Sequence, residues 1–210
     1  MKIVHIVRHG ESYSNTSDFW MSDDVGLTEK GINQANAVAS RFENLPIEII
    51  FSSNIQRAKD TALIIKSKID KPIEYHDLFN ERKWPSEQNG LHKKGEESNK
   101  MSEKIWKIFP NPELRYSDEE NFTDLKERIK NILLFLESRQ EENIMIVTHG
   151  FILRIMMAYI VMGEDLSPEE CDQFIDKFHT KNTGITTIHH GKTNKKTNWH
   201  LSSWNDHSHL

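Results

Sequence analysis

The sequence has little cysteine and no long apolar run. Its 210 residues include one cysteine, Cys171, so no disulfide can form within the chain. A lone thiol suits a reducing compartment, and we expect a cytoplasmic protein. The most apolar stretch, residues 151–162, contains Arg154 and is too short to cross a bilayer, so no membrane partner is expected. The apolar run at residues 3–7 is too short for a secretion signal.

An excess of positive charge is also missing. Lys and Arg number 27 against 32 Asp and Glu, which gives a formal net charge of −5. The chain therefore has no general field that attracts nucleic acid, and any site for an anion must be built locally. Apolar residues make up 36% of the sequence, enough for a sizeable core. The length fits one domain, which we expect to span residues 1–210.

Short apolar runs alternate with helical patterns along the chain. Strands are predicted at residues 3–7, 47–51, 73–75, 144–147, 184–189 and 198–201, with a hairpin turn around Asn194. Helices are predicted between them, and Thr28 and Ser167 are good N-caps for two of these helices. This alternation predicts an α/β fold, a three-layer α/β/α sandwich around a mostly parallel sheet. A polar stretch interrupts the pattern, and we expect a lid-like insertion around residues 80–120.

Two of the predicted strands end in the same way. Arg8-His9-Gly10 closes the first strand, and Thr148-His149-Gly150 closes a late one. Ligands of open α/β sheets bind beyond the carboxyl ends of the strands, where both histidines are placed. The glycine after each histidine lets the chain turn sharply and lets a ligand come close.

A third strand end adds another cation to this edge of the sheet. Arg57 lies in the first turn of the helix that follows residues 47–51. Guanidinium groups match phosphate oxygens through paired hydrogen bonds, so Arg8 and Arg57 predict a phosphate site. The remaining histidines show no spacing known for metal ligands, and no metal is expected.

The histidines suggest how such a phosphate could react. A neutral imidazole is a good nucleophile near pH 7 and can attack phosphorus without a separate base. A second histidine can bind the equatorial oxygens, while the arginines stabilise their charge. The leaving alkoxide needs a proton from a carboxyl group. Spacing alone does not identify that acid among the 32 carboxylates.

Five ordered segments resemble the motifs of one known family. They are Arg8-His9-Gly10-Glu11-Ser12, Leu27-Thr28-Glu29-Lys30-Gly31, Ser52-Ser53 with Arg57-Ala58, Leu78-Phe79-Asn80-Glu81-Arg82, and Thr148-His149-Gly150. On these residues the chain resembles the histidine phosphatase superfamily, also called the phosphoglycerate mutase-like family, over essentially its whole length. The resemblance implies a phosphoglycerate mutase-like fold and a metal-independent enzyme without a cofactor.

The resemblance also implies roles for individual residues. His9 would carry the phosphoryl group, and Arg8, Arg57 and His149 would complete the phosphate pocket. Glu81 would donate a proton to the leaving group and then act as a base.

Two further residues are candidate substrate contacts. Asn15 would contact the phosphate from the first loop. Arg82 belongs to a segment closer to the cofactor-dependent mutases than to the glycine-rich stretch of many phosphatases, and it is either a substrate contact or a surface charge. Arg154 is expected to be a structural partner in an ion pair.

Three functions compete for this sequence. The stretch from Glu81 to His149 is shorter than in those mutases and should leave a phosphoenzyme open to water. We therefore predict hydrolysis of the phosphomonoester of a small phosphorylated metabolite by a monomer or homodimer. Mutase-type phosphoryl transfer is the alternative. A non-catalytic module that binds a phosphorylated ligand is disfavoured, because such a module needs no proton donor.

Overall fold

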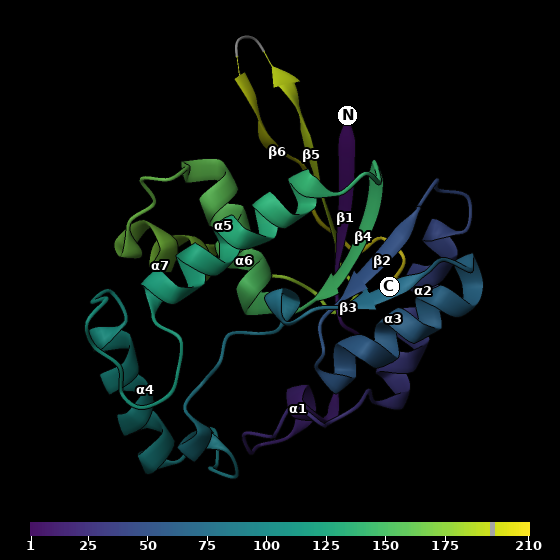
Figure 1. Cartoon of the computed structure of the whole chain (residues 1–210). Coiled ribbons are helices and arrows are strands. Elements are labelled where there is room, and N and C mark those ends of the chain that lie inside the picture. Colours follow the sequence, from purple (N-terminus) through teal and green to yellow (C-terminus); the bar gives the residue numbers. More distant parts are fainter. Residues whose placement is uncertain (194–195) are drawn as a thin grey trace.

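The sheet places the ends of its parallel strands at one edge. The computed structural model describes residues 1–193 and 196–210. The strands follow the order β3-β2-β4-β1-β5-β6 (Figure 1). The parallel strands are β1 (Lys2–Arg8), β2 (Ile49–Ser52), β3 (Ile73–Tyr75) and β4 (Asn143–Thr148). An antiparallel pair, β5 (Ile185–Thr193) and β6 (Lys196–Asp206), extends the sheet beside β1. The predicted mostly parallel sheet is confirmed.

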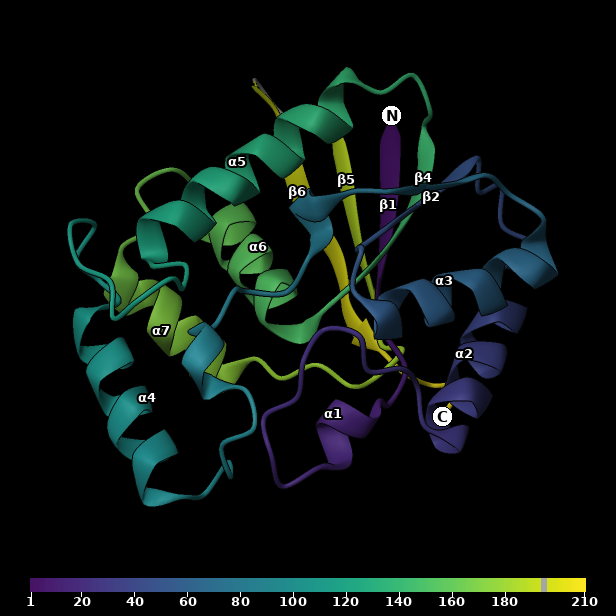
Figure 2. The same ribbon diagram turned by 60° about the horizontal axis from the view of Figure 1, so that its bottom comes forward.

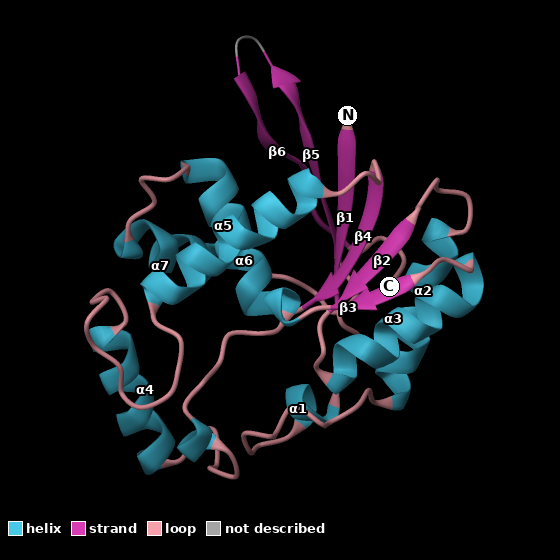
Figure 3. Ribbon diagram, viewed as in Figure 1, coloured by secondary structure: helices cyan, strands magenta, loops and turns pink. Residues whose placement is uncertain are grey.

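Helices cover both faces of this sheet (Figure 3). On one face lie α2 (Glu29–Phe42) and α3 (Gln56–Ile69). On the other lie α5 (Phe122–Ser138), α6 (Gly150–Met162) and α7 (Pro168–Lys177). Side chains of β1 alternate between them, since Val4 and Ile6 join the α5–α7 core while Val7 joins the α2–α3 core. The predicted three layers are therefore confirmed.

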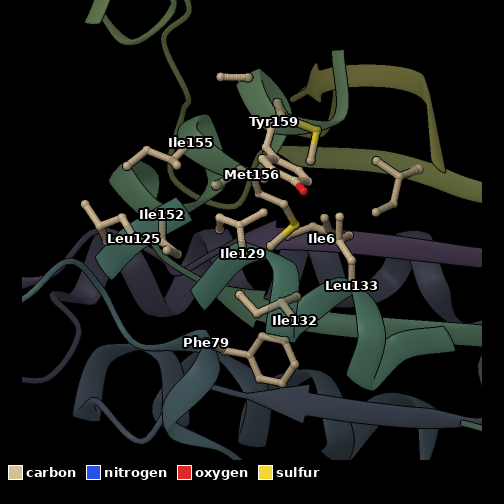
Figure 4. Close-up of a cluster of buried hydrophobic side chains, with 14 of the residues drawn as sticks. Ile6, Phe79, Leu125, Ile129, Ile132, Leu133, Ile152, Ile155, Met156 and Tyr159 are labelled. Carbon is tan, nitrogen blue, oxygen red and sulfur yellow. The ribbon is translucent and has the colours of Figure 1, made fainter. Parts of the chain in front are cut away.

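The larger core fixes β1 against α5 and α6. Ile129 and Ile132 of α5 pack with Ile152 and Met156 of α6 near Ile6 (Figure 4). All five side chains are fully buried, and burying an aliphatic side chain of this size contributes about 1.5–3 kcal/mol. Because both histidines lie next to these elements, at the ends of β1 and β4, this packing holds their backbones at a constant separation.

Both predicted N-caps form. The Thr28 hydroxyl accepts a hydrogen bond from the backbone N–H of Gly31 at 3.0 Å. The Ser167 hydroxyl accepts one from the N–H of Glu170 at 3.2 Å, and it starts α7 as part of a capping box. The local sequence signal was sufficient here because each cap involves residues only three positions apart.

Some elements differ from the expectation. A short helix, α1 (Tyr13–Thr16), occurs in the first loop, which is too short a stretch to show helical periodicity. Strands β5 and β6 are longer than predicted, because backbone pairing continues through their polar residues. The predicted turn at Asn194 lies outside the described residues.

The segment after β3 leaves the sheet. It contains the short 3₁₀ turns η1 (Asp77–Phe79) and η2 (Ser86–Gln88), followed by α4 (Glu96–Ile108). Figure 2 shows α1 and α4 beyond the carboxyl ends of the parallel strands. Within residues 1–193 and 196–210, no helix combines the length and apolar character needed to cross a membrane.

Candidate active site

A cavity of about 900 Å³ opens at the carboxyl edge of the parallel strands. The predicted site residues that line it are Arg8, His9, Asn15, Arg57, Glu81 and Arg82. His149 is fully buried behind this surface, and its ring centroid lies 5.0 Å from that of His9. The structure thus brings residues from four separate strand ends and loops to one place.

His9 presents one defined nitrogen for chemistry. Its Nδ1 lies 2.7 Å from the carbonyl oxygen of Gly10, which can only accept a hydrogen bond. Nδ1 therefore carries the proton, and in the neutral ring Nε2 keeps its lone pair. The backbone N–H of His9 donates to the carbonyl of Thr148 at 2.9 Å, so the two elbows are also joined directly.

His149 has the opposite arrangement. Its Nε2 lies 2.8 Å from the hydroxyl oxygen of Ser53. The Ser53 hydroxyl donates its own proton to the side-chain oxygen of Asn80 at 2.8 Å. The hydroxyl oxygen of Ser53 therefore accepts the proton of His149 Nε2. The Nδ1 atom of His149 is buried and has no hydrogen-bond partner among the described residues. In the neutral ring it is a free acceptor.

Both imidazoles are kept neutral by their surroundings. Burial lowers the pKa of His9 well below 6.5, and the charges of Arg57 and Arg8 lower it further. Burial likewise lowers the pKa of His149 well below 6.5, with His9 and then Arg57 as the next causes. An unprotonated His9 is the form that can act as a nucleophile.

The two arginines are held by different partners. Arg8 donates from Nη1 to the carbonyl of Thr180 at 2.6 Å, and its Nε is buried without a partner among the described residues. Arg57 is 8% exposed and lies 3.8 Å from the carboxylate of Asp23. Their guanidinium groups supply positive charge at the cavity wall in a chain of negative net charge.

Glu81 is anchored at the start of α6. Its Oε1 accepts from the backbone N–H groups of Arg82 and Ile152, both at 3.0 Å. Its Oε2 accepts from the N–H of Phe151 at 3.1 Å. His149, the N-cap residue of α6, makes no side-chain cap itself, so Glu81 satisfies these helix N–H groups instead.

Asn15 is oriented by hydrogen bonds to its side-chain oxygen. That oxygen accepts from the backbone N–H of Ser12 at 3.1 Å and from the side chain of Asn182 at 3.2 Å. Asn182 also donates to the carbonyl of His9 at 2.9 Å, which ties the first loop to the elbow. The amide nitrogen of Asn15 is left to donate toward the cavity that this residue lines.

Comparison with known proteins settles the family. Residues 4–207 match the model of the histidine phosphatase superfamily (branch 1). The chain belongs to this superfamily. It is 29% identical to a metal-independent phosphoserine phosphatase of Arabidopsis thaliana, over 99% of this chain and 82% of that protein. It is 31% identical to a 2,3-bisphosphoglycerate-dependent phosphoglycerate mutase of Thermoplasma acidophilum, over 79% of this chain and 80% of that protein.

A solved structure agrees with these relatives. A mutant phosphoserine phosphatase of Entamoeba histolytica in complex with phosphoserine superposes with a TM-score of 0.74, at 25% identity and with all of both chains covered. The predicted family is confirmed, and so is an enzyme of phosphatase or mutase-type phosphoryl transfer.

Arg82 of this histidine phosphatase is not a surface charge. Its side chain is 2% exposed, and both terminal nitrogens are buried without a partner among the described residues. Although the residue contributes to the cavity wall, these nitrogens are covered and do not reach the cavity in this conformation.

Arg154 differs from its expectation as well. It donates to the carbonyls of Gly150 at 3.2 Å and Ile175 at 2.7 Å, and within the described residues it forms no ion pair. Backbone carbonyls at the joint between α6 and α7 satisfy the guanidinium in place of the carboxylate that we expected.

Two residues with structural roles in this superfamily site escaped prediction. The Thr61 hydroxyl accepts from the backbone N–H of Gly10 at 3.0 Å, so α3 fixes the first elbow. A Cβ atom on Gly31 would lie 1.9 Å from the carbonyl oxygen of Glu11, so only glycine allows α2 to approach this loop. Gly31 lies in one of the segments that resemble the family motifs, whereas the quoted motifs give no signal for Thr61.

In the part of the chain that the structure describes, no group of His, Cys, Asp and Glu side chains has the arrangement of a metal site.

Proposed function

We propose that this histidine phosphatase hydrolyses phosphomonoesters of small metabolites through a phosphohistidine on His9. The observation that carries the proposal is the state of His9. It lines the cavity between Arg8 and Arg57 with Nδ1 engaged by a carbonyl, which leaves Nε2 as its reactive atom. Relatives named as phosphoserine phosphatases make phosphoserine the first substrate to test.

In the first step, Nε2 of His9 attacks phosphorus and the bond to the ester oxygen breaks. Arg8 and Arg57 stabilise the charge spread over the equatorial oxygens, and Asn15 donates to one of them. A phosphomonoester monoanion transfers its proton to Nδ1 of His149, which then donates to an equatorial oxygen and returns this proton when inorganic phosphate leaves. Glu81 gives a proton to the leaving alkoxide.

In the second step, Glu81 takes a proton from water and the resulting hydroxide attacks the phosphohistidine. The bond between phosphorus and Nε2 breaks, and inorganic phosphate and neutral His9 are released. The same carboxyl group serves as acid and then as base, so the enzyme returns to its starting state without a cofactor.

Mutase-type transfer is the second candidate, because a phosphoglycerate mutase is among the relatives. We favour hydrolysis because the segment between Glu81 and His149 is short. Residues 80–120 would act as a partial, lid-like cover of a single domain, and water would reach the phosphoenzyme. A single cysteine further supports a cytoplasmic location.

One product analysis separates these candidates. Purified protein is incubated in EDTA with phosphoserine, and separately with 3-phosphoglycerate with and without 2,3-bisphosphoglycerate. Hydrolysis predicts release of inorganic phosphate from either substrate. Formation of 2-phosphoglycerate without phosphate release would establish the mutase, and tight binding without turnover would establish a binding module. A metal-dependent phosphatase inhibited by EDTA serves as the control for contamination.

A further inference from the structure

The guanidinium of Arg82 is enclosed by aromatic rings. Its central carbon lies 4.3 Å from the ring centroid of Trp84, 4.5 Å from Phe109, 5.1 Å from Phe151 and 5.3 Å from Trp106. These distances are within the range of cation–π attraction. We call these four rings the aromatic box.

The aromatic box encloses a guanidinium group that makes few hydrogen bonds among the described residues. Only Nε of Arg82 has a hydrogen bond among the described residues, to the carbonyl of Glu120 at 3.2 Å. Burial lowers the pKa of Arg82 to about 10, so the group keeps its charge at neutral pH. A buried charge without direct ionic partners is costly, and ring faces together with the nearby carboxylates of Glu119 and Glu120 offset that cost.

The aromatic box is joined to the carboxylate of Glu81 at two points. The backbone N–H of Arg82 itself donates to Oε1 of Glu81. Phe151 forms one wall of the box, and its backbone N–H donates to Oε2 of Glu81. A shift of the guanidinium would therefore move two of the three N–H groups that hold this carboxylate.

The other side of the same backbone is held independently. Arg128 donates from Nη1 to the carbonyl of Asn80 at 2.7 Å and is paired with Glu120 at 2.8 Å. The N–H of Glu120 in turn donates to the carbonyl of Lys83 at 3.0 Å. Residues 80–83 are thus fixed between Arg128 and the aromatic box.

We propose that Arg82 is a positioning residue that acts through Glu81 and does not contact substrate. Trp106 and Phe109 belong to α4 and its end, so the box also couples the insertion to the proton donor. This inference rests on the function proposed above, in which Glu81 protonates the leaving group.

The test compares substrates that differ in their need for an acid and in their charge. Phosphoserine has a poor leaving group and a carboxylate, glycerol 2-phosphate has a poor leaving group and no carboxylate, and p-nitrophenyl phosphate has a good leaving group. In Arg82→Met, kcat should fall at least about 10-fold more for the two poor leaving groups than for p-nitrophenyl phosphate, as in Glu81→Gln. KM for phosphoserine should change less than about twofold.

Other outcomes would overturn the proposal. A rise in KM confined to phosphoserine would show that Arg82 contacts the carboxylate of the substrate. Equal loss for all three substrates would show a purely structural role. Arg82→Lys keeps the cation, so its kcat for the two poor leaving groups should fall less than in Arg82→Met.

Two further variants keep the test decisive. Arg115→Met changes a half-exposed arginine of the same insertion, paired with Asp124, and should leave all three rates unchanged. If Arg82→Met does not fold, Phe109→Leu removes one wall of the aromatic box and should give the same pattern at smaller size. Failure of the wild-type protein to hydrolyse any of the substrates would refute the proposed function instead.

Discussion

The two histidine elbows have similar local sequences, but their rings use different nitrogens for hydrogen bonding. Each follows a buried strand and precedes a glycine, and each ring is neutral because of burial. His9 uses Nδ1 to donate to its neighbour's carbonyl, whereas His149 uses Nε2 to donate to Ser53. Of these two histidines, His9 lines the cavity and His149 does not. A repeated motif therefore places two imidazoles, and their hydrogen-bond partners distinguish His9 as the proposed nucleophile.

The strongest way to break this comparison is to remove the proposed nucleophile. His9→Ala should lower turnover more than about 10⁴-fold, because no other group can form the covalent intermediate. Acid-labile labelling by a radioactive phosphomonoester should disappear as well. Normal turnover in this variant would refute the mechanism.

Removal of the second imidazole should have a smaller effect. His149→Ala should lower kcat about 10²- to 10³-fold, because it deletes one stabilising donor and leaves the nucleophile. Rapid-quench labelling should still detect the phosphoenzyme, which forms more slowly. Loss of labelling equal to that of His9→Ala would show that the two rings are not distinct in role.

The hydrogen bond between His149 and Ser53 can be tested by substitution of Ser53. Ser53→Ala removes the acceptor of His149 Nε2 and should lower kcat about 10-fold, since the ring loses its fixed orientation. Ser52→Ala is the matched control, because Ser52 is an equally buried neighbour whose hydroxyl contacts only the carbonyl of Ser53 in the described structure. Steady-state kinetics on both variants would show equal effects if orientation were unimportant.

The neutral state of the rings gives a dependence of stability on pH. Both pKa values are lowered in the folded state, so below about pH 6.5 the unfolded chain binds more protons than the folded one. Stability is fully present above that pH and falls as the pH decreases toward the folded pKa values. Each buried ring should contribute about 1.4 kcal/mol per pH unit.

Urea unfolding between pH 6 and pH 5 measures this slope. His149→Gln should have a smaller slope than the wild-type protein, by about 1.4 kcal/mol per pH unit. The acid limb of kcat/KM in the wild-type enzyme should likewise lie below pH 6.5. Identical slopes in the two proteins would contradict the neutral state of His149.

Local patterns predicted the sheet, the caps at Thr28 and Ser167 and the two elbows, because each signal lies within a few neighbouring residues. The burial of Arg82 could not be predicted in this way. Its aromatic box draws rings from the segment after β3, from α4 and from α6, which are far apart in sequence. The hydrogen bond between Thr61 and Gly10 joins residues 51 positions apart and was invisible for the same reason.

The hydrogen bonds of Glu81 also give this residue a structural role at the start of α6. Its carboxylate terminates the free N–H groups of α6, the helix that directly follows the second elbow. In the proposed reaction, the protonated carboxyl group would be a weaker acceptor at the positive helix end, so the start of α6 would be held less firmly until the proton leaves. Truncating the side chain would consequently uncap a helix, at a cost of about 1 kcal/mol, and simultaneously delete the proton donor. The glutamine variant keeps one of the two acceptor oxygens and removes the acidic proton, so it disturbs the start of α6 less than truncation does.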